Sequence, residues 1–230
     1  MLERVVREKW LTAKGVVAFW PCRRDGDDVV LYTDETRTRE LSRLYFLRQQ
    51  VEKRSGRANM CLADFVSPEA DWIGGFAVTA GHGIEEHLAR FRADHDDYSD
   101  ILLKALADRL AEAFAERLHE RVRKTLWGYA PDEALSNDEL VRERYRGIRP
   151  APGYPACPDH SQKPELFRLL NAGQRALPVL LRDRHARALR DTRGPALRLG
   201  EPGERAYQLP APVLRRVEVR DVTELRLGGG

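Results

Sequence analysis

Residues 98–127 read YSDILLKALADRLAEAFAERLHERVRKTLW, and this stretch decides the fold. Its apolar side chains recur at three- and four-residue steps, which is the spacing of one helix face. They are Leu103, Leu106, Leu110, Ala113, Phe114, Leu118 and Val122. Acids and bases fill most of the positions between them. The pattern predicts a single helix of about 30 residues, roughly 45 Å long, whose apolar face packs on a core.

The start of the chain predicts a helix followed by a hairpin. Residues 2–13 carry apolar side chains among charges and predict a helix, which Gly15 breaks. The apolar runs 15–20 and 29–32 predict two strands. Between them stands Asp25-Gly26-Asp27-Asp28, and an Asp-Gly pair tolerates the positive φ of a tight turn.

Two more strands are predicted over residues 61–66 and 72–79, because both runs are apolar and bounded by turn-forming residues. After Gly83 the apolar period changes to 3.6 residues and predicts another helix. Residues 36–51 carry signals for both helix and strand, and the choice between them stays open. Together with the long helix, these elements predict an α+β fold in which an antiparallel sheet packs against long helices.

The segment after the long helix has less regular structure. Ser136 and Glu139 form a capping box, which predicts a short helix through Tyr145. Residues 149–160 hold four prolines and one glycine and predict a stiff loop that is neither helix nor strand. Pro164 suits the first turn of a further short helix that runs through Leu170.

The charge of the chain is uneven. There are 39 Lys+Arg and 36 Asp+Glu, a net charge of +3, but residues 175–230 alone contribute +5 and leave the rest at −2. This distribution argues against a nucleic-acid or membrane partner, because the basic end lacks aromatic anchors and a recognisable module. No apolar run approaches the roughly 20 residues of a membrane span, and three scattered cysteines are typical of a reducing compartment. We therefore predict a cytoplasmic protein.

The Pro-rich loop is the most informative candidate for a binding site. A stiff loop loses little entropy when it binds a ligand, and it presents backbone groups in fixed positions. Arg149 at its start offers a planar fork that suits a carboxylate, and Tyr154 offers a ring face and a hydroxyl. A purely structural Pro-rich turn is the alternative, and composition alone leaves both open.

Other candidate residues carry weaker signals. Cys157 and His160 resemble half of a zinc site, but no second pair stands at a suitable spacing, and the acidic cluster 94–97 reads equally well as a solvated turn. Glu112 shares a helix face with His119, and it lies beside the apolar stripe, where its carboxylate could face a cation. Glu143, just before the loop, could act in the same way, although a solvated helix charge is the default for both acids.

Several segments together resemble one known family, the activation domain of cobalamin-dependent methionine synthase. They occur in the family's order and extend to about Leu170. The resembling segments are EKWLTA (8–13), GVV (15–17), DETRT (34–38), LRQQ (47–50), LADF (62–65), KALADRLAEAFAE (104–116), WGY (127–129) and RGIRPAPGYPACPDH (146–160).

The resemblance implies binding of S-adenosylmethionine for the reductive methylation of cob(II)alamin to methylcobalamin. The site residues implied by the family are Arg149, Ala151, Tyr154, Glu112 and Glu143. Arg149 would hold the ligand's carboxylate, Ala151 and Tyr154 would line the adenosine groove, and the two glutamates would face its cationic groups. The implied partners are the cobalamin-binding domain of the synthase and a flavodoxin-type reductant. No protein side chain need act as a nucleophile.

The resemblance also suggests where the domain ends. Residues 1–172 are expected to form a partial activation domain that lacks contacts the family has before and after it. Residues 173–230 are Arg-rich and unlike the family, so we expect a divergent tail, out of frame or disordered, with a genuine extension as the alternative. A docking module without its own ligand, or an inactive fragment, stays open as an alternative function. No homocysteine, folate or cobalamin module is recognisable in the chain.

Overall fold

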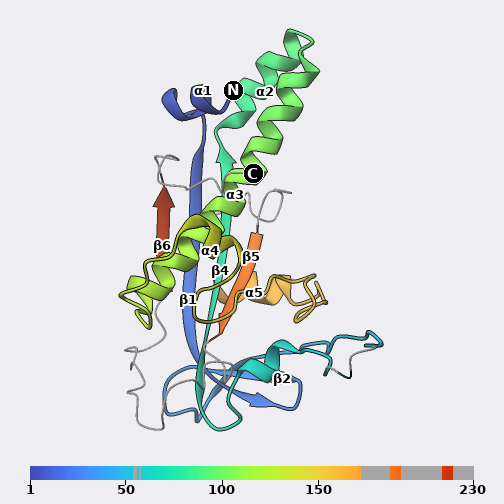
Figure 1. Ribbon diagram of the computed structural model, residues 1–230, viewed down its shortest axis with the longest axis vertical. Coiled ribbons are helices and arrows are strands. Elements are labelled where there is room, and N and C mark those ends of the chain that lie inside the picture. The colour runs from blue at the N-terminus through green and yellow to red at the C-terminus, as the bar shows by residue number, and fades with distance from the viewer. Residues whose placement is uncertain (54–55, 57, 172–186, 193–213, 220–230) are drawn as a thin grey trace.

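The computed structural model describes residues 1–53, 56, 58–171, 187–192 and 214–219 (Figure 1). Strands and helices are grouped along the chain, which agrees with an α+β fold. In sequence they are α1 (Leu2–Arg7), β1 (Thr12–Asp25), β2 (Asp28–Tyr32), β3 (Glu40–Leu44), the 3₁₀ helix η1 (Leu62–Phe65), β4 (Asp71–His82), α2 (Ile84–Ala93), α3 (Asp97–Arg121), the π-helical turn η2 (Val122–Leu126), α4 (Asn137–Val141), α5 (Lys163–Leu169), β5 (Arg187–Thr192) and β6 (Leu214–Val219).

The strands of the described chain form one antiparallel sheet in the order β3-β2-β1-β4-β5, with β6 also paired to β1. β1 and β4 are the long central strands and pair from Thr12↔His82 to Cys22↔Asp71. They run along the long axis of the molecule in Figure 1. β2 pairs with only the last residues of β1, so β6 can pair with the earlier part of the same edge, from Ala13 to Ala18.

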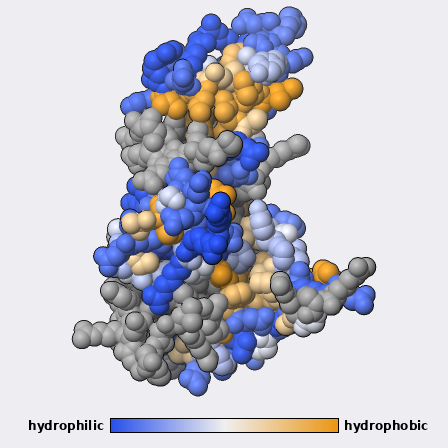
Figure 2. Space-filling model, in the orientation of Figure 1, coloured by the Kyte–Doolittle hydropathy of each residue, from blue (hydrophilic) through white to orange (hydrophobic). Residues whose placement is uncertain are grey.

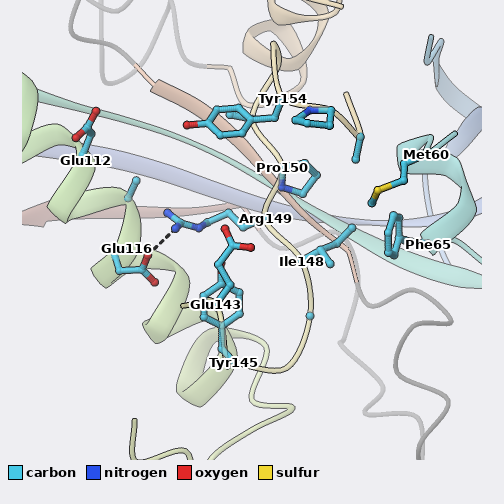
Figure 3. Close-up of a pocket in the computed structure, with 15 residues that line it drawn as sticks. Met60, Phe65, Glu112, Glu116, Glu143, Tyr145, Ile148, Arg149, Pro150 and Tyr154 are labelled. Carbon is cyan, nitrogen blue, oxygen red and sulfur yellow. Dashed lines mark hydrogen bonds and ion pairs between the residues drawn. The ribbon is translucent and has the colours of Figure 1, made fainter. Parts of the chain in front are cut away.

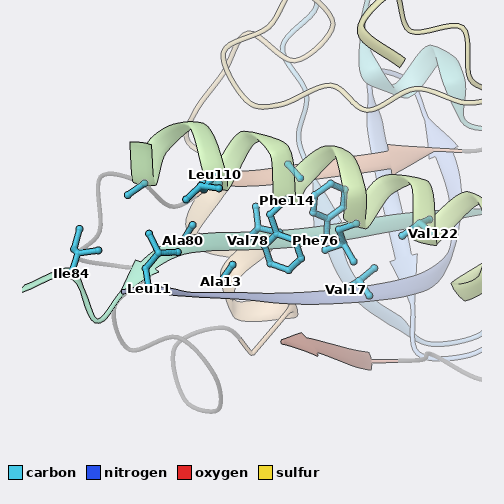
Figure 4. Packing of buried hydrophobic residues seen from close by; sticks show 14 of the residues in the cluster. Leu11, Ala13, Val17, Phe76, Val78, Ala80, Ile84, Leu110, Phe114 and Val122 are labelled. Atoms are coloured by element: carbon cyan, nitrogen blue, oxygen red, sulfur yellow. The ribbon is translucent and has the colours of Figure 1, made fainter. Parts of the chain in front are cut away.

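Each face of the central strands belongs to a different core cluster, because side chains alternate between the two faces of a sheet. Ala13, Val17 and Phe19 of β1 pack in the cluster that α3 covers (Figure 4). Val16, Ala18 and Trp20 pack in the cluster on the other face, together with α5 and η1. A strand buried on both faces reads as a continuous apolar run, and this explains the uninterrupted apolar stretch at 15–20.

The long helix is confirmed. α3 runs from Asp97 to Arg121 and continues as the π-helical turn η2 to Leu126. The side chain of Asp96 caps its start by accepting a hydrogen bond from the Ser99 N–H at 3.0 Å. Most of the predicted apolar stripe is buried, but Leu106 and Ala113 are only half-buried and line a surface groove beside α4.

The hairpin and the strand at 72–79 are also confirmed, while the first helix is shorter than predicted. Asp25 pairs with Asp28 across the turn, and Gly26 has a φ of +62°. The helix predicted over 2–13 ends at Arg7, because Lys9 takes a left-handed φ of +53° that a helix cannot accommodate. The open segment 36–51 contains β3, from Glu40 to Leu44.

The strand predicted over 61–66 is wrong, since these residues form the 3₁₀ helix η1. The side chain of Asp64 accepts a hydrogen bond from the Cys61 N–H at 3.0 Å and folds the segment into a turn. The guanidinium of Arg48 contacts both oxygens of Asp64, at 2.7 and 2.8 Å, and fixes it there. Local bonds between side chain and backbone therefore override the apolar pattern.

The two short helices after α3 are shorter than predicted, and the Pro-rich loop has the irregular structure predicted for it. The capping box of Ser136 and Glu139 is formed, but α4 ends at Val141, short of the predicted Tyr145. Glu143 follows with a φ of +54°, which ends the helix. Residues 149–160 contain no helix or strand beyond one isolated bridge, and Pro164 lies in the first turn of α5.

Part of the predicted tail lies outside the described residues. Its described pieces are β5 and β6, whose backbones pair with β4 and β1. The domain boundary at residue 172 and the divergent origin of the tail stay predictions.

The surface is polar over much of the face seen in Figure 2, with apolar side chains gathered near the end where α1, α2 and α3 meet. Ile101, near the start of α3, is 66% exposed. Among the residues that the structure describes, no helix is long and apolar enough to cross a membrane.

Candidate functional site

A cavity of about 640 Å³ lies between α3 and the Pro-rich loop (Figure 3). This volume falls within the usual range for small-molecule sites. All five site residues expected from the sequence line it: Arg149, Ala151, Tyr154, Glu112 and Glu143. The fold therefore brings Glu112 of α3, Glu143 just after α4, and the Pro-rich loop to a single cavity.

The Pro-rich loop is held in place by its own backbone bonds. The Gly153 N–H donates to the Cys157 carbonyl at 2.8 Å, and the Cys157 N–H donates to the Tyr154 carbonyl at 2.8 Å. Gly153 has a φ of +102°, which favours glycine, and a Cβ there would lie 2.7 Å from the His160 ring. Ala156 and Cys157 are buried and anchor the loop in the core, while Tyr154 stays 59% exposed.

Arg149 makes an ion pair that the sequence did not reveal. Its Nη2 donates to Oε2 of Glu116 at 2.5 Å, and the two side chains are 16% and 26% exposed. In Figure 3, Arg149 extends from the loop toward α3, where Glu116 lies. Glu116 follows Glu112 by four residues and so shares its helix face, and this spacing was the only signal that could have identified it.

The cavity carries more negative than positive charge. Glu112, Glu116 and Glu143 line it, and Arg149 is its only cationic side chain among the described lining residues. Glu112 also accepts a hydrogen bond from the exposed Arg109 at 2.9 Å. The expected pair of Glu112 with His119 is not a shared site, since His119 is fully buried and does not line the cavity. The charge distribution suits a ligand that combines cationic groups with one carboxylate.

Tyr145 forms part of the cavity wall and was not expected from the sequence. Its side chain is buried, and burial raises the pKa of its hydroxyl, while nearby Arg149 opposes this rise and Glu143 and Glu116 add to it. The hydroxyl is therefore neutral at physiological pH and remains a hydrogen-bond donor. The pKa of Tyr145 responds to Arg149, Glu143 and Glu116, and all three of these residues line the cavity.

A buried cluster of polar and charged side chains contacts the ring of Tyr145. Arg123 in η2 has no exposed surface and bonds both oxygens of Glu133, at 2.8 and 2.7 Å. Its guanidinium carbon lies 4.3 Å from the centre of the Tyr145 ring, and the His119 ring meets the same ring edge-on at 4.8 Å. Cation–π and edge contacts of this kind fix a ring in one orientation.

The apolar side of the cavity comes from a third segment. Phe65 of η1 and Met60, which precedes Cys61, line the cavity opposite α3. The apolar pattern at 61–66 pointed to a strand, so the sequence did not connect these residues with the site.

The described residues were expected to offer at most a weak metal site near Cys157 and His160. Within the described ranges, no three His, Cys, Asp or Glu side chains are placed to hold a metal ion. The three cysteines are all buried, and none of them forms a disulfide bond. In the acidic cluster 94–97, Asp96 serves as the cap of α3.

The sequence of the chain matches a known protein family over most of its length. The model of the vitamin B12 dependent methionine synthase activation domain matches residues 1–185. The chain belongs to this family. The match covers β1 to β4, the long helix and every described residue that lines the cavity.

A solved structure is similar to the chain in both fold and sequence. The crystal structure of the MetH reactivation domain bound to AdoHcy is similar to the chain with a TM-score of 0.76 and 50% sequence identity. The similarity covers 85% of this chain and 62% of the reactivation domain. The chain thus spans less than two thirds of the length of that domain.

Proposed function

We propose that the cavity between α3 and the Pro-rich loop binds S-adenosylmethionine for the reductive methylation of cob(II)alamin to methylcobalamin in a methionine synthase. The observation that carries the proposal is that all five residues implied by the family meet in one cavity of suitable size. The related reactivation domain was crystallised with AdoHcy, which differs from S-adenosylmethionine by the transferred methyl group.

Each of the five residues has a role that fits its position. Arg149 would bind the carboxylate of the methionine moiety, since it is the cationic residue among the described lining residues. The exposed ring of Tyr154 and the backbone at Ala151 would flank the adenosine. Glu112 and Glu143 would stabilise the positive sulfonium, because carboxylates favour a nearby cation. The chain would hold and orient the methyl donor. None of its side chains would act as a nucleophile.

The proposed reaction needs two further partners. A cobalamin-binding domain of the synthase would carry the cofactor, and a flavodoxin-type protein would supply one electron. When bound there, cobalamin supplies the reduced cobalt that accepts the methyl group. We infer a cytoplasmic location from these partners and from three cysteines that form no disulfide bond.

A methylation assay tests the proposed function. A cobalamin-binding domain loaded with cob(II)alamin would be mixed with a chemical reductant and S-adenosylmethionine, and methylcobalamin would be followed by its absorbance. We expect the chain to accelerate methylcobalamin formation and Arg149→Ala to abolish most of the acceleration. An equal rate with and without the chain would overturn the proposal. A chain that binds the cobalamin domain but takes up no S-adenosylmethionine would instead be a docking module.

A further inference from the structure

The ion pair between Glu116 and Arg149 leaves two buried atoms without a hydrogen-bond partner. Oε2 of Glu116 accepts from Nη2 of Arg149, but its other oxygen, Oε1, has no partner among the described residues. Nε of Arg149 is buried and likewise unpaired there. Buried polar groups are nearly always hydrogen-bonded in folded proteins, so each such atom calls for an explanation.

The two unpaired atoms are of opposite kinds. Oε1 of Glu116 can only accept a hydrogen bond, and Nε of Arg149 can only donate one. The α-ammonium of an amino acid is a donor, and its α-carboxylate is an acceptor attached to the same carbon. One amino acid head group placed beside the ion pair could therefore satisfy both atoms without breaking the bond between Glu116 and Arg149.

We propose that Glu116 accepts the α-ammonium of the ligand while Arg149 binds its α-carboxylate, so that the pair selects ligands with an intact α-amino acid head group. The inference rests on the proposed function, because it names the part of the same ligand that Glu116 recognises. It assigns to Glu116 a binding role that the family resemblance did not imply.

Glu116 is better placed for this role than the other two acids of the cavity. Its side chain is 26% exposed, against 42% for Glu112, whose carboxylate already contacts Arg109. Glu143 is exposed to solvent after the end of α4. A carboxylate that is less exposed interacts more strongly with a cation, because water screens it less. Glu112 and Glu143 remain suited to the sulfonium, because both line the same cavity.

Calorimetric titration with three ligands tests the inference. S-adenosylhomocysteine carries the complete head group, its deamino analogue keeps only the carboxylate, and 5′-methylthioadenosine has neither group. For Glu116→Gln, we expect affinity for S-adenosylhomocysteine to fall about tenfold or more, as is typical when a hydrogen bond to a charged group is lost. Affinities for the other two ligands should change less than about twofold, since neither has an ammonium.

Glu120→Gln is the matched control. Glu120 lies one turn further along α3, and it too accepts from an arginine, Arg117, at 2.5 Å, but it does not line this cavity. We expect this variant to bind all three ligands like the wild type. Thermal unfolding of both variants checks that each is folded. Should Glu116→Gln fail to fold, Glu116→Asp keeps the charge on a shorter side chain and should show the same ligand-specific loss.

The outcomes separate this inference from the proposed function. If the wild type binds neither S-adenosylhomocysteine nor S-adenosylmethionine, the proposed function itself is wrong. If the wild type binds but Glu116→Gln binds S-adenosylhomocysteine equally well, only the role of Glu116 is wrong. Tighter binding by the variant would also overturn that role, because Glu116 would then compete with the ligand for Arg149. An equal loss for all three ligands would mean that the substitution merely distorts the cavity.

Discussion

Gly153 shows how a single residue shapes the candidate site. Its φ of +102° allows the turn that brings Tyr154 and Ala151 to the cavity, and its N–H bonds the Cys157 carbonyl. A side chain at this position would be strained by the backbone conformation and would meet the His160 ring. The shape of the loop therefore depends on glycine as well as on its prolines.

Gly153→Ala should weaken binding of S-adenosylmethionine severalfold and lower the free energy of unfolding by about 1–2 kcal/mol, the usual cost of a left-handed alanine. Gly128→Ala is the control, because Gly128 also has a positive φ, +79°, but has open space around it and does not line the cavity. We expect it to lose similar stability while keeping its affinity in a calorimetric titration. Equal losses of affinity in both variants would contradict the role given to the loop.

At the level of elements, α3 serves the core and the site with different faces. Phe114 and Leu118 pack on the sheet, and Gly15 of β1 lets the helix approach closely, since a Cβ there would lie 3.1 Å from the Phe114 ring. Glu112 and Glu116, on a neighbouring face, line the cavity. Packing of the helix against the sheet thus fixes where its acids lie.

Phe114→Ala should lower the free energy of unfolding by about 3–5 kcal/mol, because it leaves a cavity between α3 and the sheet. Ile101→Ala, on the same helix but 66% exposed, should change it by less than about 0.5 kcal/mol. Urea unfolding measures both values. Similar losses in the two variants would mean that α3 does not pack on the sheet as described.

Elements with a strong apolar period could be predicted from the sequence, and those fixed by particular side-chain bonds could not. α3 follows from the spacing of its apolar residues, and β4 follows from an apolar run bounded by turn-forming residues. The 3₁₀ helix η1 depends on Asp64 and Arg48, which meet only in the folded chain, so its apolar run was misread as a strand. α1 ends because the backbone of Lys9 is left-handed, and no residue pattern around Lys9 predicts that conformation.

For the whole molecule, the site is assembled from segments that are distant in sequence: η1, α3 and residues 143–156. Residue types and positions suggested Arg149, Tyr154, Glu112 and Glu143, and the resemblance to a family added Ala151 and the ligand that these residues would bind. Glu116 and Tyr145 were missed, because their importance comes from contacts across the fold. Such contacts leave no local pattern in a sequence.

The stability of the whole molecule should decrease in acid. Hydrogen bonds from Arg48 lower the pKa of Asp64, and hydrogen bonds from Arg43 and Thr36 lower the pKa values of Asp25 and Asp34. A carboxylate whose pKa is lower in the folded state stabilises the fold above its unfolded pKa of about 4, and this contribution is lost as the pH falls through the folded pKa.

We therefore expect the urea midpoint to be constant from about pH 7 to 5 and to fall steadily between about pH 5 and 2. Asp64→Asn should unfold at lower urea at neutral pH and show a shallower decline in acid. A midpoint that is unchanged between pH 6 and pH 3 would contradict the ion pairs and caps described for the fold.

The most direct test of the central claim is calorimetric titration of the chain with S-adenosylmethionine. We predict saturable binding to one site in the wild type and in Arg142→Ala, whose side chain is exposed and lies outside the cavity. Arg149→Ala should weaken binding about thirtyfold or more, because the ligand's carboxylate would lose its charged partner. Absence of heat from the wild type at millimolar ligand, or equal affinity in the two arginine variants, would contradict the claim.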